Sequence, residues 1–423
     1  MKHFLISPLI LLQVFTSYDS NAQVLTDRGD SARLLTEIMQ RYPEYFSRFM
    51  KDQDSFKIQV IYTKIDRDSH NQPIFNNYYY KVDSFLYFYP ASTVKLPIAL
   101  LALQKVNELR LPGLDKYSTI ITECDSAGQT AVYNDPTTQD GRPSVSSYVK
   151  KIFLVSDNDA FNRLYEFLGQ EYINRRLQQM GYTDVQILHR LSLSLTSSQN
   201  RNTNPISFFG PTGNLLYRQP GIVSKMTFQK RHDFIGAGYI DISDHLINRP
   251  MDFSEKNRIQ LKDLHNILKS IIFPNSVPTN QRFNLLDEDY AFLYQYMSEF
   301  PGESIFPRYD SLEYWNTFGK LLFWGSDKAT KPGHIRIFNK EGDAYGFLTD
   351  VSYLVDFEKK IEFFLSATIY CNNDGILNDD KYDYQTIGLP FLKHLGQVIY
   401  EYELKRPRSN QPDLRPFMMT YVK

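Results

Sequence analysis

The sequence predicts a mixed α/β (α+β) protein, because both strand-like alternation and helical spacing recur along the chain. Apolar residues alternate near both ends of the 423 residues, as in half-buried strands, and helical spacing recurs in the long region between them. The run Leu96–Leu103 is apolar on every side, which predicts a helix buried at the centre of the protein. The length suffices for one large or two ordinary domains with a sizeable core.

The elements follow from these patterns and from the Gly, Pro, Asp and Asn residues that interrupt them. The expected helices are Ser31–Met50, a helix from Ser92 to the Arg110–Gly113 stop, Tyr148–Val155 capped by Ser144 or Ser146, Ala160–Leu168, Gln170–Met180, Arg258–Ile272 and Tyr382–Glu403. The expected strands are Phe56–Ile65, Ile74–Val82, His334–Gly342, Tyr345–Phe357 and Ile361–Cys371. Pro205–Pro220 and Phe273–Pro278 are expected to be surface connections.

Composition argues against two classes of partner. The net charge of −1 and the pI near 6.7 leave no basic field for nucleic acid or an anionic membrane. Residues 1–22 have a positive start, an apolar run and small residues before a cut at Gln23, which is typical of a secretory signal peptide. No other stretch is long enough to span a membrane, so we expect a secreted or periplasmic protein.

The cysteine and histidine residues give little support to a metal or cofactor. Cys124 and Cys371 are the only cysteines, and they either form a disulfide or are both free. The eight histidines show no His-x-x-x-His or His-Glu-x-x-His spacing. We expect neither a cofactor nor a metal.

Ser92 and Lys95 are the first candidate catalytic residues. Positions three apart share a face of a helix, so the hydroxyl and the amine would point the same way. A serine attacks an acyl carbon when a neighbouring group takes its proton, and a lysine with a lowered pKa can do so. The alternative is that Ser92 only caps the helix and Lys95 extends to solvent.

Two further motifs follow Ser-x-x-Lys in the order seen in penicillin-recognising serine enzymes. Ser156-Asp157-Asn158 lies between two expected helices, where it could also be a simple cap. Lys340-Glu341-Gly342 ends an expected strand.

With these three motifs the chain resembles the serine β-lactamase and penicillin-binding superfamily, and class A β-lactamases most closely. The resemblance covers roughly residues 30 to 403, and the region between Ser156 and Lys340 is longer than in typical members. It implies an antiparallel sheet built from N-terminal and C-terminal strands, helices on the faces of the sheet, and an inserted helical subdomain. The implied domains are a signal peptide (1–22), a catalytic domain (23–403, with the subdomain at about 104–330) and a C-terminal tail (404–423).

The resemblance also implies roles for the matching residues. These are Ser92 as acylated nucleophile, Lys95 as its base or proton relay, Ser156 as proton shuttle, Asn158 as a substrate contact, Lys340 as a cation that lowers the pKa of Lys95 and attracts an anionic substrate group, and Gly342 and Asp343 as substrate-binding positions. The backbone N–H groups of Ser92 and Asp343 would form the oxyanion hole.

Two departures from the superfamily pattern affect the expected reaction. Class A enzymes carry an Arg followed shortly by a Glu that activates the deacylating water, but the corresponding stretch Leu188–Ser194 has no carboxylate. His189 could substitute as the base, or it could be a surface residue. Glu341 stands where the family has a hydroxyl residue, and it would repel a substrate carboxylate if its side chain faces the pocket; alternation along the strand instead suggests that Glu341 points away from Lys340.

The sequence thus predicts an exported serine hydrolase that forms an acyl-enzyme at Ser92 and hydrolyses β-lactam amides. A D-alanyl peptidase or esterase on cell-wall or other acyl substrates is the first alternative. A binding module that keeps the fold without turnover is the second.

Overall fold

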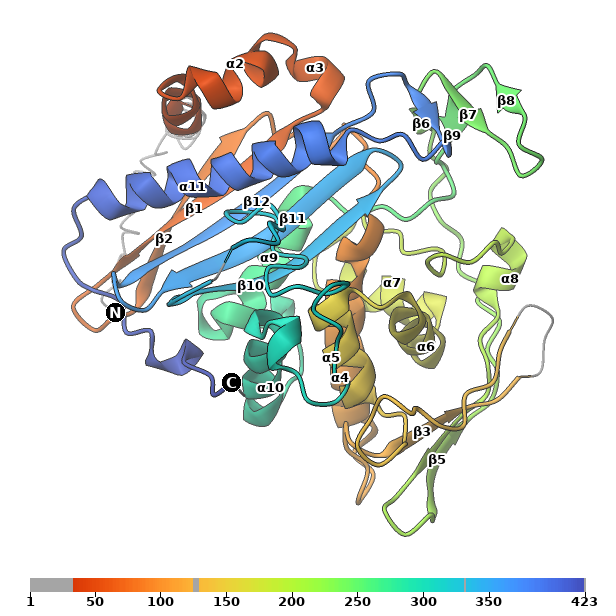
Figure 1. The fold of residues 1–423 in the computed structure, drawn as a ribbon. Coiled ribbons are helices and arrows are strands. Elements are labelled where there is room, and N and C mark those ends of the chain that lie inside the picture. Colours follow the sequence, from red (N-terminus) through yellow and green to blue (C-terminus); the bar gives the residue numbers. More distant parts are fainter. Residues whose placement is uncertain (1–32, 125–128, 331, 422–423) are drawn as a thin grey trace, which may run out of the picture.

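The computed structural model describes residues 33–124, 129–330 and 332–421, so the expected signal peptide lies outside the described residues. Its centre is a five-stranded antiparallel sheet in the order β10-β11-β12-β1-β2. The strands are β1 (Gln59–Arg67), β2 (Pro73–Tyr80), β10 (Ile335–Ala344), β11 (Phe347–Asp356) and β12 (Ile361–Tyr370). Strands from the two ends of the chain meet where β1 pairs with β12, which confirms the expected sheet (Figure 1).

Both faces of the sheet are covered, and for this reason the central strands are apolar on both sides. Along β1, Val60 and Tyr62 belong to one buried cluster, whereas Ile61 and Ile65 belong to the other. All ten residues of β11 are buried. The sheet is therefore the middle layer of three.

The first face carries the N-terminal helices and the last helix of the chain, which crosses the sheet in Figure 1. These are a helix at 33–40, α2 (Pro43–Lys51), α3 (Gln53–Phe56) and α11 (Leu389–Lys405), the last entered through a π-helical turn at Tyr384–Gly388. The single helix expected at Ser31–Met50 is two helices. Pro43 has no backbone N–H to continue the first helix, but it fits the first position of a new one.

The second face carries the helices that position the site (Figure 1). They are α4 (Lys95–Leu109), α5 (Val145–Val155), α6 (Asn158–Leu168), α7 (Gln170–Gln179), α9 (Leu261–Ile272) and α10 (Asp287–Ser298). Helix α4 is buried on every side as expected, because it packs against α5, α6 and α9 as well as the sheet layer. The helix α10 was not expected from the sequence, since its aromatic residues obscure its apolar face.

The long insertion also contains short strands that the sequence did not predict. They are β3 (Thr119–Thr122), β4 (Ile206–Phe209), β5 (Leu215–Gln219), β6 (Phe234–Ile235), β7 (Gly238–Ile240), β8 (Leu246–Ile247) and β9 (Met251–Asp252), with a short helix α8 (Ser197–Arg201). A further short strand, β13 (Ile376–Leu377), follows β12 and pairs with β7. The expected surface connection Pro205–Pro220 is wrong in part, because it forms the β4–β5 hairpin of a three-stranded sheet. Strands of four or five residues are too short to show a clear alternation.

Three remaining observations bear on the sequence expectations. Cys124 is exposed and Cys371 is buried, and the two do not form a disulfide. After α11 the chain packs back on the body of the protein, where Leu414 and Phe417 are buried. Within the described ranges, no helix is both long and apolar enough to cross a bilayer.

Candidate active site

Ser92 lies in a 3₁₀ turn, Ala91–Val94, that leads directly into α4. The turn is sharp, since Ala91 has a positive φ of 46° that non-glycine residues rarely adopt. Thr93 and Val94 are buried, whereas Ser92 is only partly covered. The local structure therefore anchors the turn in the core and leaves the candidate nucleophile accessible.

Lys95 is fully buried, and its Nζ lies at the centre of the site. The amine is 2.8 Å from Ser92 Oγ, 3.1 Å from Ser156 Oγ and 2.7 Å from Asn158 Oδ1, and it also donates to the Ser156 carbonyl. A carbonyl and an amide oxygen can only accept hydrogen bonds. A neutral amine therefore uses its two N–H groups on these oxygens, which leaves its lone pair for a serine hydroxyl.

The electrostatic surroundings of Lys95 favour this neutral amine. Burial is the largest cause, and the nearby Lys340 ammonium adds to it, so the pKa of Lys95 lies well below its ordinary value. The carboxylates of Glu341, Asp157 and Asp343 oppose the shift without cancelling it. Lowering this pKa increases the neutral fraction of the amine, and only the neutral amine can take a proton from Ser92.

Ser156 and Asn158 occupy the junction between α5 and α6. Ser156 ends α5 in the left-handed region with φ 57°, while Asp157 caps α6 by accepting from the Ala160 N–H at 2.7 Å. The motif is thus both a cap and part of the site, because the left-handed turn directs the Ser156 side chain toward the two lysines. Asn158 accepts from Lys95 through Oδ1, so it orients the amine.

Lys340 reaches the same serine from the edge strand β10. Its Nζ is fully buried and donates to Ser156 Oγ at 2.8 Å and to the backbone oxygen and side-chain Oε1 of Glu341, both at 2.9 Å. The Ser156 hydroxyl therefore bridges Lys95 and Lys340. A proton can pass along this chain of contacts in either direction.

Simple strand alternation suggests that Glu341 points away from Lys340, but the structure shows otherwise. The Glu341 carboxylate turns back to form an ion pair with the Lys340 amine at 2.9 Å. Burial is the largest single influence and would raise the pKa of this carboxyl, but the charge and hydrogen bond of Lys340, a backbone hydrogen bond and the charge of Lys95 together lower the pKa below its ordinary value. Glu341 is therefore a carboxylate at neutral pH.

Gly342 brings β10 against the serine turn. A Cβ at this position would lie 2.7 Å from the Ser92 nitrogen and 2.8 Å from the Pro90 oxygen, so any side chain would push the strand away. The next residue, Asp343, has an exposed side chain. The oxyanion hole expected from the Ser92 and Asp343 N–H groups remains a prediction.

A cavity of about 710 Å³ opens beside these residues. Ser156, Glu341 and Asp343 line one part of it. Segment 315–328 and the start of α11 supply the remaining walls, with Trp315 and Tyr384 as aromatic surfaces. Concave sites of this size with a few polar groups accommodate small-molecule substrates.

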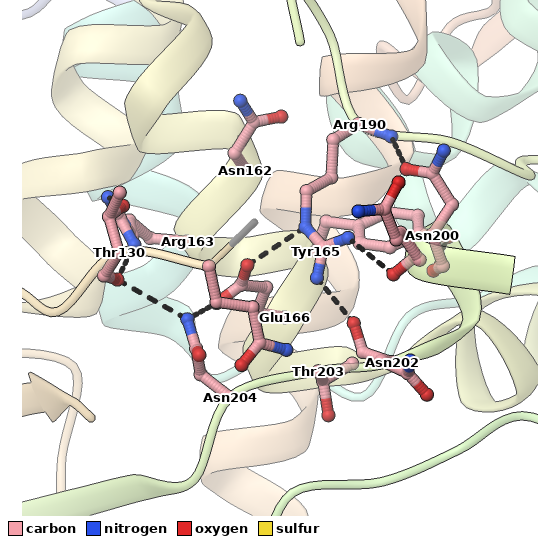
Figure 2. A network of polar contacts seen from close by, with 12 residues as sticks. Thr130, Asn162, Arg163, Tyr165, Glu166, Arg190, Asn200, Asn202, Thr203 and Asn204 are labelled. Carbon is pink, nitrogen blue, oxygen red and sulfur yellow. Dashed lines mark hydrogen bonds and ion pairs between the residues drawn. The ribbon is translucent and has the colours of Figure 1, made fainter. Parts of the chain in front are cut away.

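The loop expected to carry a deacylation base is held by a buried polar network, shown in Figure 2. Arg190 forms an ion pair with Glu166 of α6 at 2.8 Å, and both side chains are almost fully buried. Arg190 also donates to the Asn202 carbonyl at 2.5 Å. Asn162, one turn after Asn158 on α6, exchanges hydrogen bonds with the backbone of Leu191. The loop is thereby fixed against the helix that starts with Asn158.

Ser192 is the residue that this loop presents to the site. Its Oγ accepts from Asn158 Nδ2 at 2.8 Å, and its φ is 54°. His189, the possible substitute base, has Nδ1 2.6 Å from the Arg190 carbonyl oxygen and stacks against Tyr89. Burial lowers the pKa of His189 to about 4. The residue that touches Asn158 is therefore a serine, which cannot act as a carboxylate base.

The structure thus brings the expected residues together from α4, the α5–α6 junction and β10. Sequence reasoning did not find Ser192 or the Glu166–Arg190 pair. Ser192 could have been found as a polar residue shortly after Arg190, in the stretch where a carboxylate was expected. Among the described residues, no cluster of His, Cys, Asp or Glu has a geometry suited to a metal ion.

Comparison with known proteins agrees with the motifs. The model of a β-lactamase enzyme family matches residues 44–216, a stretch that contains the Ser-x-x-Lys and Ser-Asp-Asn motifs. No curated protein sequence matches the chain.

Several solved structures are similar at low sequence identity. A β-lactamase from Xanthomonas campestris pv. campestris is 13% identical, with a TM-score of 0.46 over 86% of this chain and 98% of that chain. A β-lactamase from Burkholderia phymatum is 12% identical, with a TM-score of 0.46 over 89% of this chain and 98% of that chain. PBP-A is 15% identical, with a TM-score of 0.46 over 88% of this chain and 95% of that chain. The family match, the sheet of terminal strands and the order of the three motifs agree with one another, and the matched stretch makes this chain similar to the β-lactamase enzyme family over residues 44–216.

Proposed function

We propose that this protein is an active-site serine hydrolase that forms an acyl-enzyme at Ser92. The observation that carries the proposal is the 2.8 Å contact between Ser92 Oγ and the buried amine of Lys95, whose pKa is strongly lowered. A serine that only capped a helix would not need a desolvated base beside it. The presence of Ser92, Lys95, Ser156 and Lys340 together also argues against a binding module without turnover.

Acylation follows from the contacts. Lys95 takes the Ser92 proton while Oγ attacks the acyl carbon and forms the new C–O bond. The protonated amine passes a proton to Ser156 Oγ, 3.1 Å away, and Ser156 gives its own proton to the leaving nitrogen or oxygen as the scissile bond breaks. Lys340, 2.8 Å from Ser156 Oγ, stabilises negative charge that develops on this hydroxyl.

Deacylation returns the enzyme to its starting state. Water attacks the acyl carbon of the ester at Ser92 and gives one proton to Lys95. Lys95 then returns a proton to Ser92 Oγ as the bond between Oγ and the acyl carbon breaks and the acid product leaves. Because Ser192 supplies no carboxylate to activate this water, we propose that acylation is faster than deacylation. The acyl-enzyme should then accumulate under single-turnover conditions.

Two substrate classes fit this chemistry. The superfamily resemblance favours the amide bond of a β-lactam ring as the bond that is cleaved. The second candidate is an esterase or peptidase acting on other acyl substrates. The Glu341 carboxylate favours it, because this carboxylate lines the cavity beside Ser156 and would repel a substrate carboxylate there. From the amino-terminal 22 residues we further propose that the protein is exported.

Intact-mass spectrometry of the mature protein tests the proposal. The protein is incubated with a serine-directed phosphonate and, separately, with benzylpenicillin, and samples are taken over time. We expect the mass of one adduct on the wild-type protein and none on Ser92→Ala. Lys95→Met should slow labelling by a factor of about 100 or more, the usual contribution of a general base.

The outcomes with the two reagents distinguish the candidate functions. A penicillin adduct that decays with release of ring-opened product supports a lactamase, and a persistent adduct supports a penicillin-binding peptidase. Labelling by the phosphonate alone supports an esterase. Labelling of Ser92→Ala, or no labelling of the wild-type protein by either reagent, would contradict the proposal.

A further inference from the structure

We infer that Glu341 makes the site reject acyl donors that carry a carboxylate next to the scissile bond and accept donors that are uncharged there. The inference rests on the proposed acyl-enzyme chemistry at Ser92 and specifies its substrate class. It assigns to Glu341 a specificity-determining role. It also replaces the expectation that Lys340 attracts an anionic substrate group.

The first step concerns the hydrogen-bonding capacity of Lys340. An ammonium group has three N–H donors and no acceptor. The contacts of Lys340 Nζ are Ser156 Oγ at 2.8 Å, the Glu341 carbonyl at 2.9 Å and Glu341 Oε1 at 2.9 Å, so all three donors are in use. A substrate carboxylate would have to displace either the Glu341 carboxylate or the proton shuttle Ser156.

The second step concerns how firmly the Glu341 carboxylate is held. Its side chain is 11% exposed, and it packs under Gly319. Gly319 has a φ of +71°, and a Cβ there would lie 3.1 Å from Glu341 Cδ. The neighbouring Lys320 anchors this segment by donating to the Met297 and Ile337 carbonyls at 2.7 and 3.0 Å. The internal carboxylate is therefore enclosed and cannot easily swing aside.

The third step concerns the charges around the cavity. Three carboxylates line the cavity together with Ser156, namely Glu341, the exposed Asp343 and Asp327. Two lysines also line it, but Lys393 is paired with Asp327 at 2.8 Å, and Lys328 lies 4.5 Å from the ring centre of Trp315. The part of the cavity that shares Ser156 is therefore neutral to negative, and it repels an anion.

A matched pair of donors tests this directly. Benzylpenicillin and its methyl ester share the same strained amide and differ in one carboxylate. Wild-type protein, Glu341→Thr, Glu341→Gln and Ser92→Ala are incubated with each, and the rate of adduct formation is followed by intact mass. We expect the wild-type protein to react at least about 100-fold faster with the ester, the penalty of placing like charges side by side in a partly desolvated site.

The variants should reduce this preference. In Glu341→Thr, Lys340 regains a free donor, so the ester-to-acid rate ratio should fall to about 1 or below. Glu341→Gln should reduce the ratio as well, because it keeps the size of the side chain and removes the charge. The ratio is taken within each variant, so a partly inactive preparation does not change it.

The outcomes are distinguishable. A wild-type protein that reacts with the acid as fast as with the ester, or a ratio unchanged in both variants, would overturn the inference and leave the serine hydrolase intact. A wild-type protein that neither donor nor a serine-directed phosphonate labels would overturn the inference together with the proposed function. Labelling by the phosphonate with neither penicillin derivative would also overturn the inference, because the uncharged donor would not have been accepted.

Discussion

Replacing Arg190 by alanine is the sharpest test of the network that holds the loop of Ser192. Arg190 and Glu166 form an ion pair at 2.8 Å with side-chain exposures of 2% and 5%. Removing one partner of a buried pair leaves an uncompensated charge, which typically costs about 3 to 5 kcal/mol. Arg175→Ala is the matched control, since Arg175 pairs with Glu171 at 2.8 Å but is 61% exposed. An exposed pair of this kind contributes at most about 0.5 kcal/mol.

The loss in Arg190→Ala should depend on pH in a defined direction. Burial raises the pKa of Glu166, and Arg190 is the main group that opposes this shift. Without Arg190 the pKa rises further above the unfolded value of about 4.5, so the folded variant takes up a proton as the pH falls through the new pKa. The destabilisation should therefore be largest above the new pKa and shrink below it by at most about 1.4 kcal/mol per pH unit, until Glu166 of the folded wild-type protein is protonated as well. The double variant Arg190→Ala/Glu166→Gln should recover part of the loss.

Urea unfolding at pH 7.5 and at pH 5.5, followed by fluorescence and by circular dichroism, measures these free energies. The decay of the acyl-enzyme in the same variants reports whether the loop of Ser192 has moved. If Arg190→Ala cost no more than Arg175→Ala, or if its cost grew as the pH fell, the argument for a buried anchoring pair would be wrong.

Three further predictions concern residues around the site and the core. In Gly342→Ala the new Cβ would lie 2.7 Å from the Ser92 nitrogen, so the free energy of unfolding should fall by about 1 to 3 kcal/mol and acylation should slow. The control is Gly333→Ala, whose new Cβ has nothing within 4 Å. It should behave as wild type in urea unfolding and in mass-labelling assays. Ser192→Glu, but not Ser192→Gln, should speed the decay of the acyl-enzyme at least about tenfold by placing a base beside Asn158; equal decay in both would refute this. Burial lowers the pKa of His265 to about 3, below its unfolded value, so this residue stabilises the fold above pH 6.5 and should cost about 2 kcal/mol between pH 7 and pH 5. In His265→Gln, urea unfolding should show a smaller pH dependence by that amount, and an unchanged slope would contradict the assignment.

Much of the central sheet and of the catalytic cluster could be predicted because short-range rules decide them. Three-residue spacing on a helix places Lys95 beside Ser92 whatever the rest of the chain does. The strands β10, β11 and β12 are long and strongly apolar, so their periodicity is clear. The order of the motifs then indicated which strand meets the helix.

The orientation of Glu341 could not be predicted, because it depends on a segment distant in sequence. Alternation along β10 places neighbouring side chains on opposite faces. The long Glu341 side chain nevertheless turns back to Lys340, and Gly319 of the segment before the strand leaves room for its carboxylate.

Similarly, nothing in the local sequence indicated that Ser156 adopts a left-handed conformation. Such tertiary effects override local preference where several elements meet.

Ser192 and Glu341 are the two departures from the superfamily pattern. Neither belongs to the proton-transfer chain of Ser92, Lys95 and Ser156. Ser92, Lys95 and Ser156 keep contacts that generate and deliver a proton, and these contacts do not depend on the charge of the substrate. Ser192 contacts Asn158 and Glu341 contacts Lys340, and in the proposed reaction these contacts bear on the attacking water and on the charge of the substrate, respectively. Acyl transfer can therefore be conserved while substrate charge and turnover rate change independently. If this separation is correct, Glu341→Thr should change the choice of donor that acylates Ser92 more than the decay rate of a given acyl-enzyme, and Ser192→Glu should do the reverse.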